Sequence, residues 1–116
     1  MKLSGTVTHL NGFAFGIKAT SLDLSTLDCT YETEGMNIYT VMNSSITEFY
    51  PPTNISQNIN FRHTTTLSID SIVRIFNNLI TTTETRTITL NQSIVNKLTE
   101  DQIAIATNKG WTVTAA

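Results

Sequence analysis

The sequence of 116 residues carries few charges, and its positive charges are dispersed. Charged side chains make up 14% of the chain, whereas soluble domains average roughly 25%. The seven lysines and arginines are spread from Lys2 to Lys109, and the formal net charge is −2. Because no basic stripe can neutralise a phosphate backbone, we do not expect the chain to bind nucleic acid.

Cysteine is almost absent, since Cys29 is the only one. A lone cysteine cannot close a disulfide within the chain, so the sequence gives no sign of an oxidising compartment. Cys29 also has no basic residue near it in the sequence that would activate it as a nucleophile. We interpret it as a small buried hydrophobic residue.

Long apolar runs are missing as well. No segment approaches the roughly 18 consecutive apolar residues that cross a bilayer. The N-terminal segment "MKLSGTVTHLNGFAFG" is interrupted by Ser, Gly, Thr, His and Asn. It therefore lacks the apolar stretch of about 7–15 residues that is found in secretory signals. We expect a soluble protein that does not insert into membranes.

Residue types that bind metals do not cluster in the sequence. His9 and His63 are the only histidines, and neither has a Cys, His, Asp or Glu at metal-ligand spacing. Asp23 and Asp28 flank a possible strand and precede two glutamates, but the chain has no D-x-D-x-D-G calcium loop. We therefore expect no metal and no cofactor.

Catalytic motifs are also absent. The chain lacks G-x-S-x-G, and Gly12 and Gly16 are not followed by the GK[ST] or G-x-G-x-x-G patterns that cradle phosphates. We interpret these glycines as turn residues and expect that the protein is not an enzyme. The carboxylates between residues 23 and 34 leave a small carbohydrate-active enzyme as one alternative.

The sequence is instead rich in Thr, Ser and Asn, as in "HTTTLS" (63–68) and "ITTTETRTITLNQS" (80–93). Threonine is β-branched and favours strands, and its hydroxyl group also suits helix N-caps. A neutral, threonine-rich exterior is common among extracellular and virion proteins. The length fits a single domain over residues 1–116.

The strongest helical pattern is "SIDSIVRIFNNLI", residues 68–80. Ser68 is placed to cap the N-terminus, Asp70 suits the positive end of the helix dipole, and the following "TTT" ends the pattern. One apolar stripe follows the helical period. Its residues are Ile69, Ile72, Val73, Phe76, Leu79 and Ile80.

A second helix is predicted in "LTEDQIAIATNKGWTVTAA", residues 98–116. Thr99 and Gln102 form a capping box, and Gly110 occupies the position where a left-handed residue ends a helix. Ile103 and Ile105 alternate with alanines, which allow a neighbouring element to approach closely. A strand then follows over residues 111–114.

Strands are predicted between and before these helices. "TRTITLN" (85–91) alternates, with Ile88 and Leu90 on one face, and "NINF" (58–61) precedes the first helix. The order strand, helix, strand, helix, strand favours parallel strands joined by helical crossovers. Residues 1–57 form a β-rich half without a long helix, with short strands at 2–10, 20–28, 36–42 and 45–50 and a turn at 51–54.

Residues 60–116 carry a resemblance to a known family. "SIDSIVRIFNNL", "TRTITLNQSIVNKL" and "LTEDQIAIATNKGWTV" together resemble the C-terminal strand–helix–strand units of irregular leucine-rich-repeat-like proteins, which are found in bacteriophage virions and in surface proteins of gut bacteria. The resemblance implies an α/β fold, a short leucine-rich-repeat-like stack. Each unit would lay one strand into a shared sheet and return by a helix, and residues 58–116 would cap the stack.

Three aromatic residues are candidates for an interface. Trp111 lies beside the predicted helix end and can either pack over it or contact a partner. Phe49 and Tyr50 precede two prolines in "EFYPP", where Tyr50 can be presented on a loop. Packing within the core or at its rim is the favoured interpretation of these two residues, as packing over the helix end is for Trp111.

The resemblance, the neutral polar composition and the lack of a catalytic motif favour a structural component of a bacteriophage particle, in the tail, baseplate or head decoration. It would act through protein–protein contacts with other virion subunits or copies of itself, and strand edges in the first half would pair with neighbours. The alternative is a leucine-rich-repeat-like adhesion or ligand-binding module of a bacterial surface protein. That module would be part of a longer chain and would bind a host protein or glycan.

Overall fold

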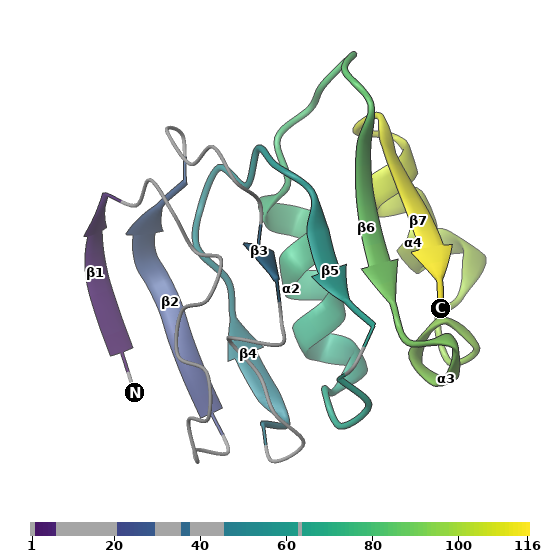
Figure 1. Cartoon of the computed structure of the whole chain (residues 1–116), viewed down its shortest axis with the longest axis horizontal. Coiled ribbons are helices and arrows are strands. Elements are labelled where there is room, and N and C mark those ends of the chain that lie inside the picture. The colour runs from purple at the N-terminus through teal and green to yellow at the C-terminus, as the bar shows by residue number, and fades with distance from the viewer. Residues whose placement is uncertain (1, 7–20, 30–35, 38–45, 63) are drawn as a thin grey trace.

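The computed structural model describes residues 2–6, 21–29, 36–37, 46–62 and 64–116. These residues form a mixed α/β fold with three helices and two small parallel sheets (Figure 1). Parallel strands need long connections, and in the second half of the chain these connections contain the helices. The coarse α/β prediction is therefore confirmed.

The first sheet contains β1 (Lys2–Thr6), β2 (Ser21–Asp28) and β4 (Glu48–Tyr50), in the order β1-β2-β4. All pairings are parallel, and Leu22 of β2 pairs with Phe49 of β4. Leu22, Leu24 and Phe49 are fully buried. Strands were predicted here, although residues 7–10 of the first predicted strand lie outside the described part of the chain.

The second sheet contains β3 (Met36–Asn37), β5 (Ile59–Phe61), β6 (Arg86–Leu90) and β7 (Trp111–Ala115), in that order. All pairings are again parallel, and Ile59, Ile88 and Val113 lie in register across β5, β6 and β7. The alternation predicted for residues 85–91 is confirmed, because Ile88 and Leu90 are buried. Residues 38–42 of the predicted third strand are not described.

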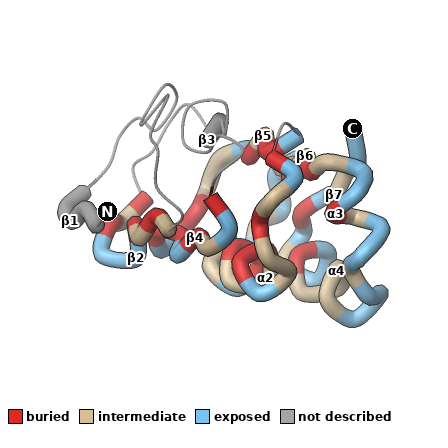
Figure 2. Tube along the Cα trace, turned by 90° about the horizontal axis from the view of Figure 1, so that it is seen from below, coloured by how far each residue is buried: buried red, intermediate tan, exposed pale blue. Residues whose placement is uncertain are grey.

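The helices α2 (Ile69–Asn78), α3 (Gln92–Val95) and α4 (Glu100–Thr107) all lie in the second half of the chain. Figure 1 shows α2 and α4 behind the second sheet. In Figure 2, β2, β4, α2 and α4 succeed one another along one side of the molecule, and β5 and β6 lie on the other. Beyond β4, helices therefore take the place that strands hold in the first half.

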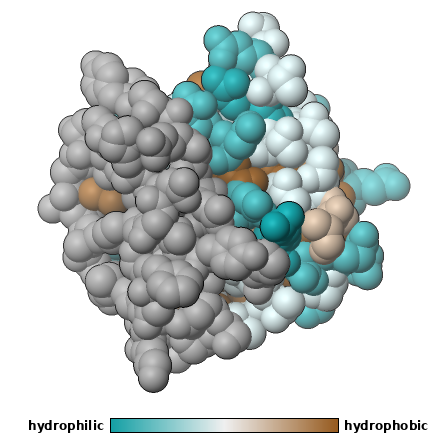
Figure 3. Space-filling view, viewed as in Figure 1, coloured by the Kyte–Doolittle hydropathy of each residue, from teal (hydrophilic) through white to brown (hydrophobic). Residues whose placement is uncertain are grey.

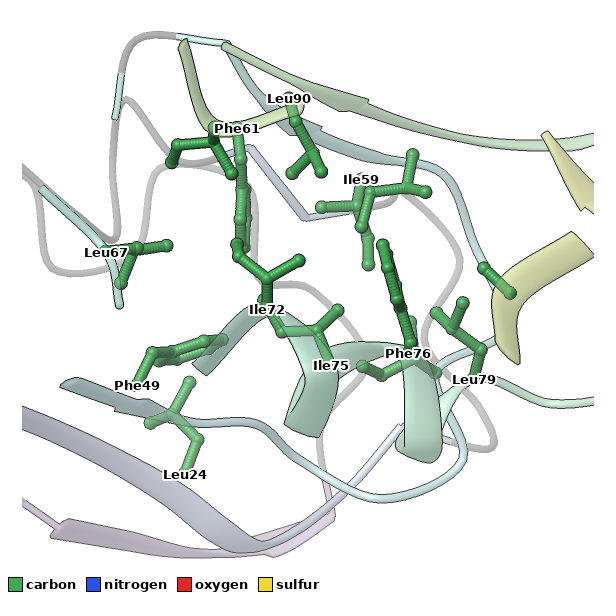
Figure 4. Packing of buried hydrophobic residues seen from close by; sticks show 14 of the residues in the cluster. Leu24, Phe49, Ile59, Phe61, Leu67, Ile72, Ile75, Phe76, Leu79 and Leu90 are labelled. Carbon is green, nitrogen blue, oxygen red and sulfur yellow. The ribbon is translucent and has the colours of Figure 1, made fainter. Parts of the chain in front are cut away.

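One hydrophobic cluster connects both sheets with the helices. Figure 4 shows Phe49 and Leu24 on one side, Ile59, Phe61 and Leu90 on the other, and residues of α2 between them. The rings of Phe49 and Phe61 meet edge to face with centroids 5.9 Å apart. This arrangement, which favours aromatic pairs, joins the first sheet to the second.

The predicted helix caps are confirmed. The Ser68 side chain accepts a hydrogen bond from the backbone N–H of Ser71, and Thr99 and Gln102 form both bonds of the capping box. Gly110 has φ = 89° and so takes the predicted left-handed conformation, although it lies two residues after the C-cap Asn108 rather than directly after the cap. These local signals fixed the start of α2 and α4 to within one residue.

Two helical details differ from the sequence prediction. Ile75 is fully buried although it lies off the predicted stripe, because α2 contacts β4 as well as the cluster beneath the second sheet. The four-residue helix α3 was not predicted. Its N-cap is Asn91, whose side chain accepts from the backbone N–H of Ser93. A helix of one turn is too short to produce a periodic apolar pattern.

Candidate functional site

The three predicted interface residues have different environments. Phe49 is 0% exposed and Trp111 is 2% exposed, and the indole Nε1 of Trp111 donates to the Ile80 carbonyl at 2.8 Å. Tyr50 is 37% exposed. Phe49 and Trp111 therefore belong to the hydrophobic core, as the packing interpretation predicted, and of the three only Tyr50 can reach a partner.

Tyr50 lies beside an ion pair between β4 and α2. The guanidinium carbon of Arg74 is 4.3 Å from the centroid of the Tyr50 ring, and Nη1 of Arg74 is 2.8 Å from Oε2 of Glu48. The hydrogen bond from Arg74, followed by one from Ser68, lowers the pKa of Glu48 below its ordinary value. Tyr50 and Arg74 are residue types that are enriched in protein interfaces.

The edge of the first sheet at β4 is closed by polar groups of α2. Ser71 is 0% exposed, and its Oγ accepts from the backbone N–H of Phe49 at 2.9 Å. The Asn78 side chain donates to the carbonyl groups of Pro51 and Pro52 at 3.3 and 3.1 Å. A buried strand edge needs such partners, since an unpaired backbone group away from water is costly.

The segment before α2 also forms hydrogen bonds with the residues that lead into β4. The backbone N–H of Ser68 donates to the Thr47 carbonyl at 2.8 Å, and Thr66 Oγ1 donates to the Ile46 carbonyl at 2.7 Å. The β4 edge is therefore bonded to helix α2 and its approach rather than to a further strand. We refer to this arrangement as the sealed edge.

The sequence contains a signal for the sealed edge, which is a polar stripe in the same segment as the stronger apolar stripe. Ser68, Ser71, Arg74 and Asn78 recur at intervals of three or four positions, which places them on one face of a helix. They form a polar stripe opposite β4, beside the apolar stripe. Reading this stripe as a strand-capping surface would have identified Ser71, Arg74 and Asn78 as contact residues.

The second sheet ends at β7, and the outer side of this strand differs from the β4 edge. In the part of the chain that the structure describes, β7 is the outermost strand of its sheet and pairs only with β6 (Figure 1). Its Thr112 is exposed and its Val113 and Thr114 are half-buried. We refer to the side of β7 that points away from β6 as the β7 edge.

The outer face of the second sheet is polar and nearly uncharged. Asn60, Thr89 and Thr114 lie in register across three strands, and the hydroxyl groups of Thr89 and Thr114 share a hydrogen bond of 2.9 Å. Figure 3 shows the surface over β5, β6 and β7 mostly in white and teal. Such a face offers hydroxyl and amide groups to a partner without a strong field of either sign.

A clamp joins the C-terminal unit to the preceding helix. The ammonium group of Lys109 donates to the carbonyl groups of Phe76, Asn77 and Leu79 at 2.8–3.1 Å. These carbonyl groups end α2, where a cation is favourable to the helix dipole. Burial lowers the pKa of Lys109. The clamp fixes the loop that leads into β7.

The remaining candidate residues that the structure describes are Asp23, Asp28 and Cys29. Asp23 accepts from the backbone and side chain of Ser25, and Asp28 accepts from the Asn54 side chain. Cys29 is buried, as predicted. His9, His63 and the two glutamates after Asp28 lie outside the described residues. Within the described ranges, no group of three or more His, Cys, Asp or Glu side chains could hold a metal ion.

Comparison with known proteins gives no relative from which a role can be transferred. No protein-family model, curated protein or solved structure matches the chain. Among the helices described here, none is long and apolar enough to cross a membrane.

Proposed function

We propose that the protein is a structural component of a bacteriophage particle, in its tail, baseplate or head decoration, and acts through protein–protein contacts. The phage assignment comes from the resemblance of residues 60–116 to repeat units of virion proteins. The contact mechanism is supported by the edges and surfaces of the two sheets. No reaction is assigned to the chain.

The observation that carries the proposal is the repeated unit in the second half. β5, β6 and β7 pair in parallel and in register, and each connection between them contains a helix. We infer that these units form a short leucine-rich-repeat-like stack, in which every unit buries its apolar side against the next. Stacks of this kind act by presenting extended surfaces rather than enclosed sites.

The polar surface fits an assembling protein. The outer face over β5–β7 presents Asn60, Thr89 and Thr114 in a row, and Tyr50 beside Arg74 offers an aromatic and cationic contact on the side of β4 and α2. Partners would be other virion subunits or further copies of the chain. The location would be the virion.

Mass spectrometry of purified phage particles tests this function. We expect the chain in particles that have been separated from free protein by density centrifugation, at a constant copy number relative to a capsid subunit. A chain that remains entirely in the soluble fraction of the lysate, as a monomer that never joins a particle, would contradict the proposal.

The second candidate is an adhesion or ligand-binding module of a bacterial surface protein. The neutral hydroxyl and amide row on the outer sheet face favours it, because a host protein or glycan could bind there by hydrogen bonds. A signal peptide encoded in the parent gene would support this candidate, whereas neighbouring capsid or tail genes would support the virion component.

A further inference from the structure

The β7 edge has a definite pattern of backbone groups. The N–H of Ala116 donates to the Leu90 carbonyl, and the carbonyl of Ala116 accepts from the N–H of Gln92. Ala116 thus directs both backbone groups toward β6 and the residues after it. Backbone groups alternate in direction along a strand, so Trp111, Val113 and Ala115 direct theirs away from β6.

We propose that this edge pairs with the β7 edge of a second copy of the chain, antiparallel and across a two-fold axis at Val113. The inference rests on the proposed function, in which copies contact one another, and it names one such contact. In this register Val113 meets Val113 of the other copy, and Trp111 meets Ala115. Every residue with outward backbone groups then faces another such residue, and each pair can exchange two hydrogen bonds.

The sequence of β7 supports pairing because it contains nothing that prevents it. Natural edge strands are commonly protected by lysine, proline or a bulge. The segment "WTVTA" contains no charge and no proline, and its register with β6 has no shift. Thr112 of one copy would lie opposite Thr114 of the other, and opposed threonines stabilise antiparallel strands.

The helix beneath β7 adds a second contact. α4 packs against β7 on the inner side of the sheet, and it leaves Ile103, Ala104 and Ile105 partly exposed. A two-fold axis perpendicular to the sheet places both copies of α4 on the same side of the joined sheet, in opposite directions. Ala104 allows close approach and the neighbouring Ile103 supplies apolar area for the contact, whereas Ile105 packs partly against the core.

A second copy fits this edge better than an unrelated extended segment. An extended peptide could bond to the backbone of β7 but would leave the partly exposed side chains of α4 uncovered. A single two-fold rotation brings β7 against β7 and α4 against α4 of the other copy. Two-fold dimers are also the commonest protein oligomers. Dimerisation through β7 would leave Tyr50 and Arg74 available for other subunits.

Sedimentation equilibrium over a range of protein concentrations tests the dimer. Val113→Pro removes the outward N–H without removing a bond to β6, because the N–H of Val113 points away from that strand. Val113→Ala shortens the side chain and keeps the N–H, and so serves as the matched control. We expect the native chain and Val113→Ala to form dimers, and Val113→Pro to dissociate at least about tenfold more readily.

Equal dimerisation of the proline and alanine variants, or a native chain that stays monomeric at about 100 µM, where even weak complexes populate, would overturn the inference. Variants with one added cysteine give a second test if Val113→Pro does not fold. Under oxidation Val113→Cys should form a dimer with itself, and Thr112→Cys should do so only when mixed with Thr114→Cys. Cys29 is 2% exposed and does not compete. Cross-linking of Thr112→Cys with itself alone would contradict the register.

Particle analysis separates this inference from the proposed function. If native chain and Val113→Pro enter phage particles equally and neither is dimeric, the function stands and the β7 dimer is wrong. If the native chain forms the predicted dimer but never enters particles, the dimer stands and the virion function is wrong.

Discussion

The β4 edge and the β7 edge belong to the same molecule but are finished in different ways. At β4, the buried hydroxyl of Ser71 accepts the backbone N–H of Phe49, and Asn78 satisfies carbonyl groups just beyond the strand. At β7, the described chain places no strand against the outward backbone groups. Helix α2 thus takes the place of a further strand at β4 because it carries polar side chains at suitable positions.

The difference follows from the side chains on the two helices. α2 has a polar stripe toward β4 and an apolar stripe toward the core. α4 is apolar or small at Ile103, Ala104, Ile105 and Ala106, and its polar residues lie near its ends. It covers the inner side of β7 but supplies no polar side chain to the strand edge. The sealed edge is thus a structural device, and the β7 edge is available for association.

The largest expected effect comes from the anchor of the β7 edge. Trp111→Ala should reduce the free energy of unfolding by about 3–5 kcal/mol, because the buried ring and its bond to Ile80 are both lost. Tyr50→Ala, which removes an exposed aromatic residue, should reduce it by less than about 1 kcal/mol. Urea denaturation compares the two variants. Equal losses would show that the β7 strand is not anchored by the core.

The next effect concerns the turn that leads into β7. A Cβ atom at Gly110 would lie 2.0 Å from the Thr82 carbonyl oxygen, and the residue has φ = 89°. Gly110→Ala should therefore destabilise the fold by about 2–4 kcal/mol. Gly110→Asn tolerates the positive φ but still carries a Cβ. If Asn restores most of the stability in thermal unfolding, the close approach to Thr82 is not the cause.

At the sealed edge, Ser71→Ala should cost about 1–3 kcal/mol, because the N–H of Phe49 loses its acceptor while it stays buried. Ser93→Ala, at an exposed serine of α3, is the matched control and should have a smaller effect. Chemical denaturation gives both values. A loss at Ser71 no larger than at Ser93 would remove the energetic basis of the sealed edge.

The Lys109 clamp should contribute about as much to the free energy of unfolding as the Ser71 hydrogen bond. Lys109→Met keeps the aliphatic stem but removes the donor to three carbonyl groups at the end of α2. We expect a loss of about 1–3 kcal/mol, as for hydrogen bonds to a charged group. Lys97→Met changes the same residue type at an exposed position and should have little effect on the melting temperature. Similar shifts for both variants would argue against a clamp.

The smallest effect is the pH dependence of the ion pair at β4. The pKa of Glu48 is lowered in the folded state from its ordinary value of 4.5. The stabilisation is therefore complete above about pH 4.5 and is lost as the pH falls through the lower, folded-state pKa. Because the pair is partly exposed, it is worth about 0.2–1 kcal/mol. Glu48→Gln should be less stable than the native chain at pH 7, and the difference between them should shrink as the pH falls below about 4.5.

Local signals in the sequence predicted much of the second half. Ser68, Thr99 with Gln102, and Gly110 fixed helix ends because each acts on backbone groups within a few residues. The alternation around Ile88 and Leu90 fixed β6 for the same reason. Parallel pairing followed from the order of these elements.

The candidate contacts were harder to predict because they join residues that are distant in the sequence. Ser71 meets Phe49 across 22 positions, and Trp111 meets Ile80 across 31. When only its neighbours in the sequence are considered, a serine within an amphipathic helix or a phenylalanine just before "YPP" can be either buried or exposed. The burial of Ser71 and Phe49 depends on how α2 packs against β4, which no local pattern specifies.

Amide hydrogen exchange at several protein concentrations tests the contrast between the two edges most directly. We predict strong, concentration-independent protection for the N–H of Phe49, and likewise for those of Thr112 and Thr114, which pair with β6. The N–H of Val113 should exchange rapidly in dilute solution and become protected as the concentration rises. Rapid exchange at Phe49, or equal protection of Val113 and Thr112 at every dilution, would contradict a sealed β4 edge and an available β7 edge.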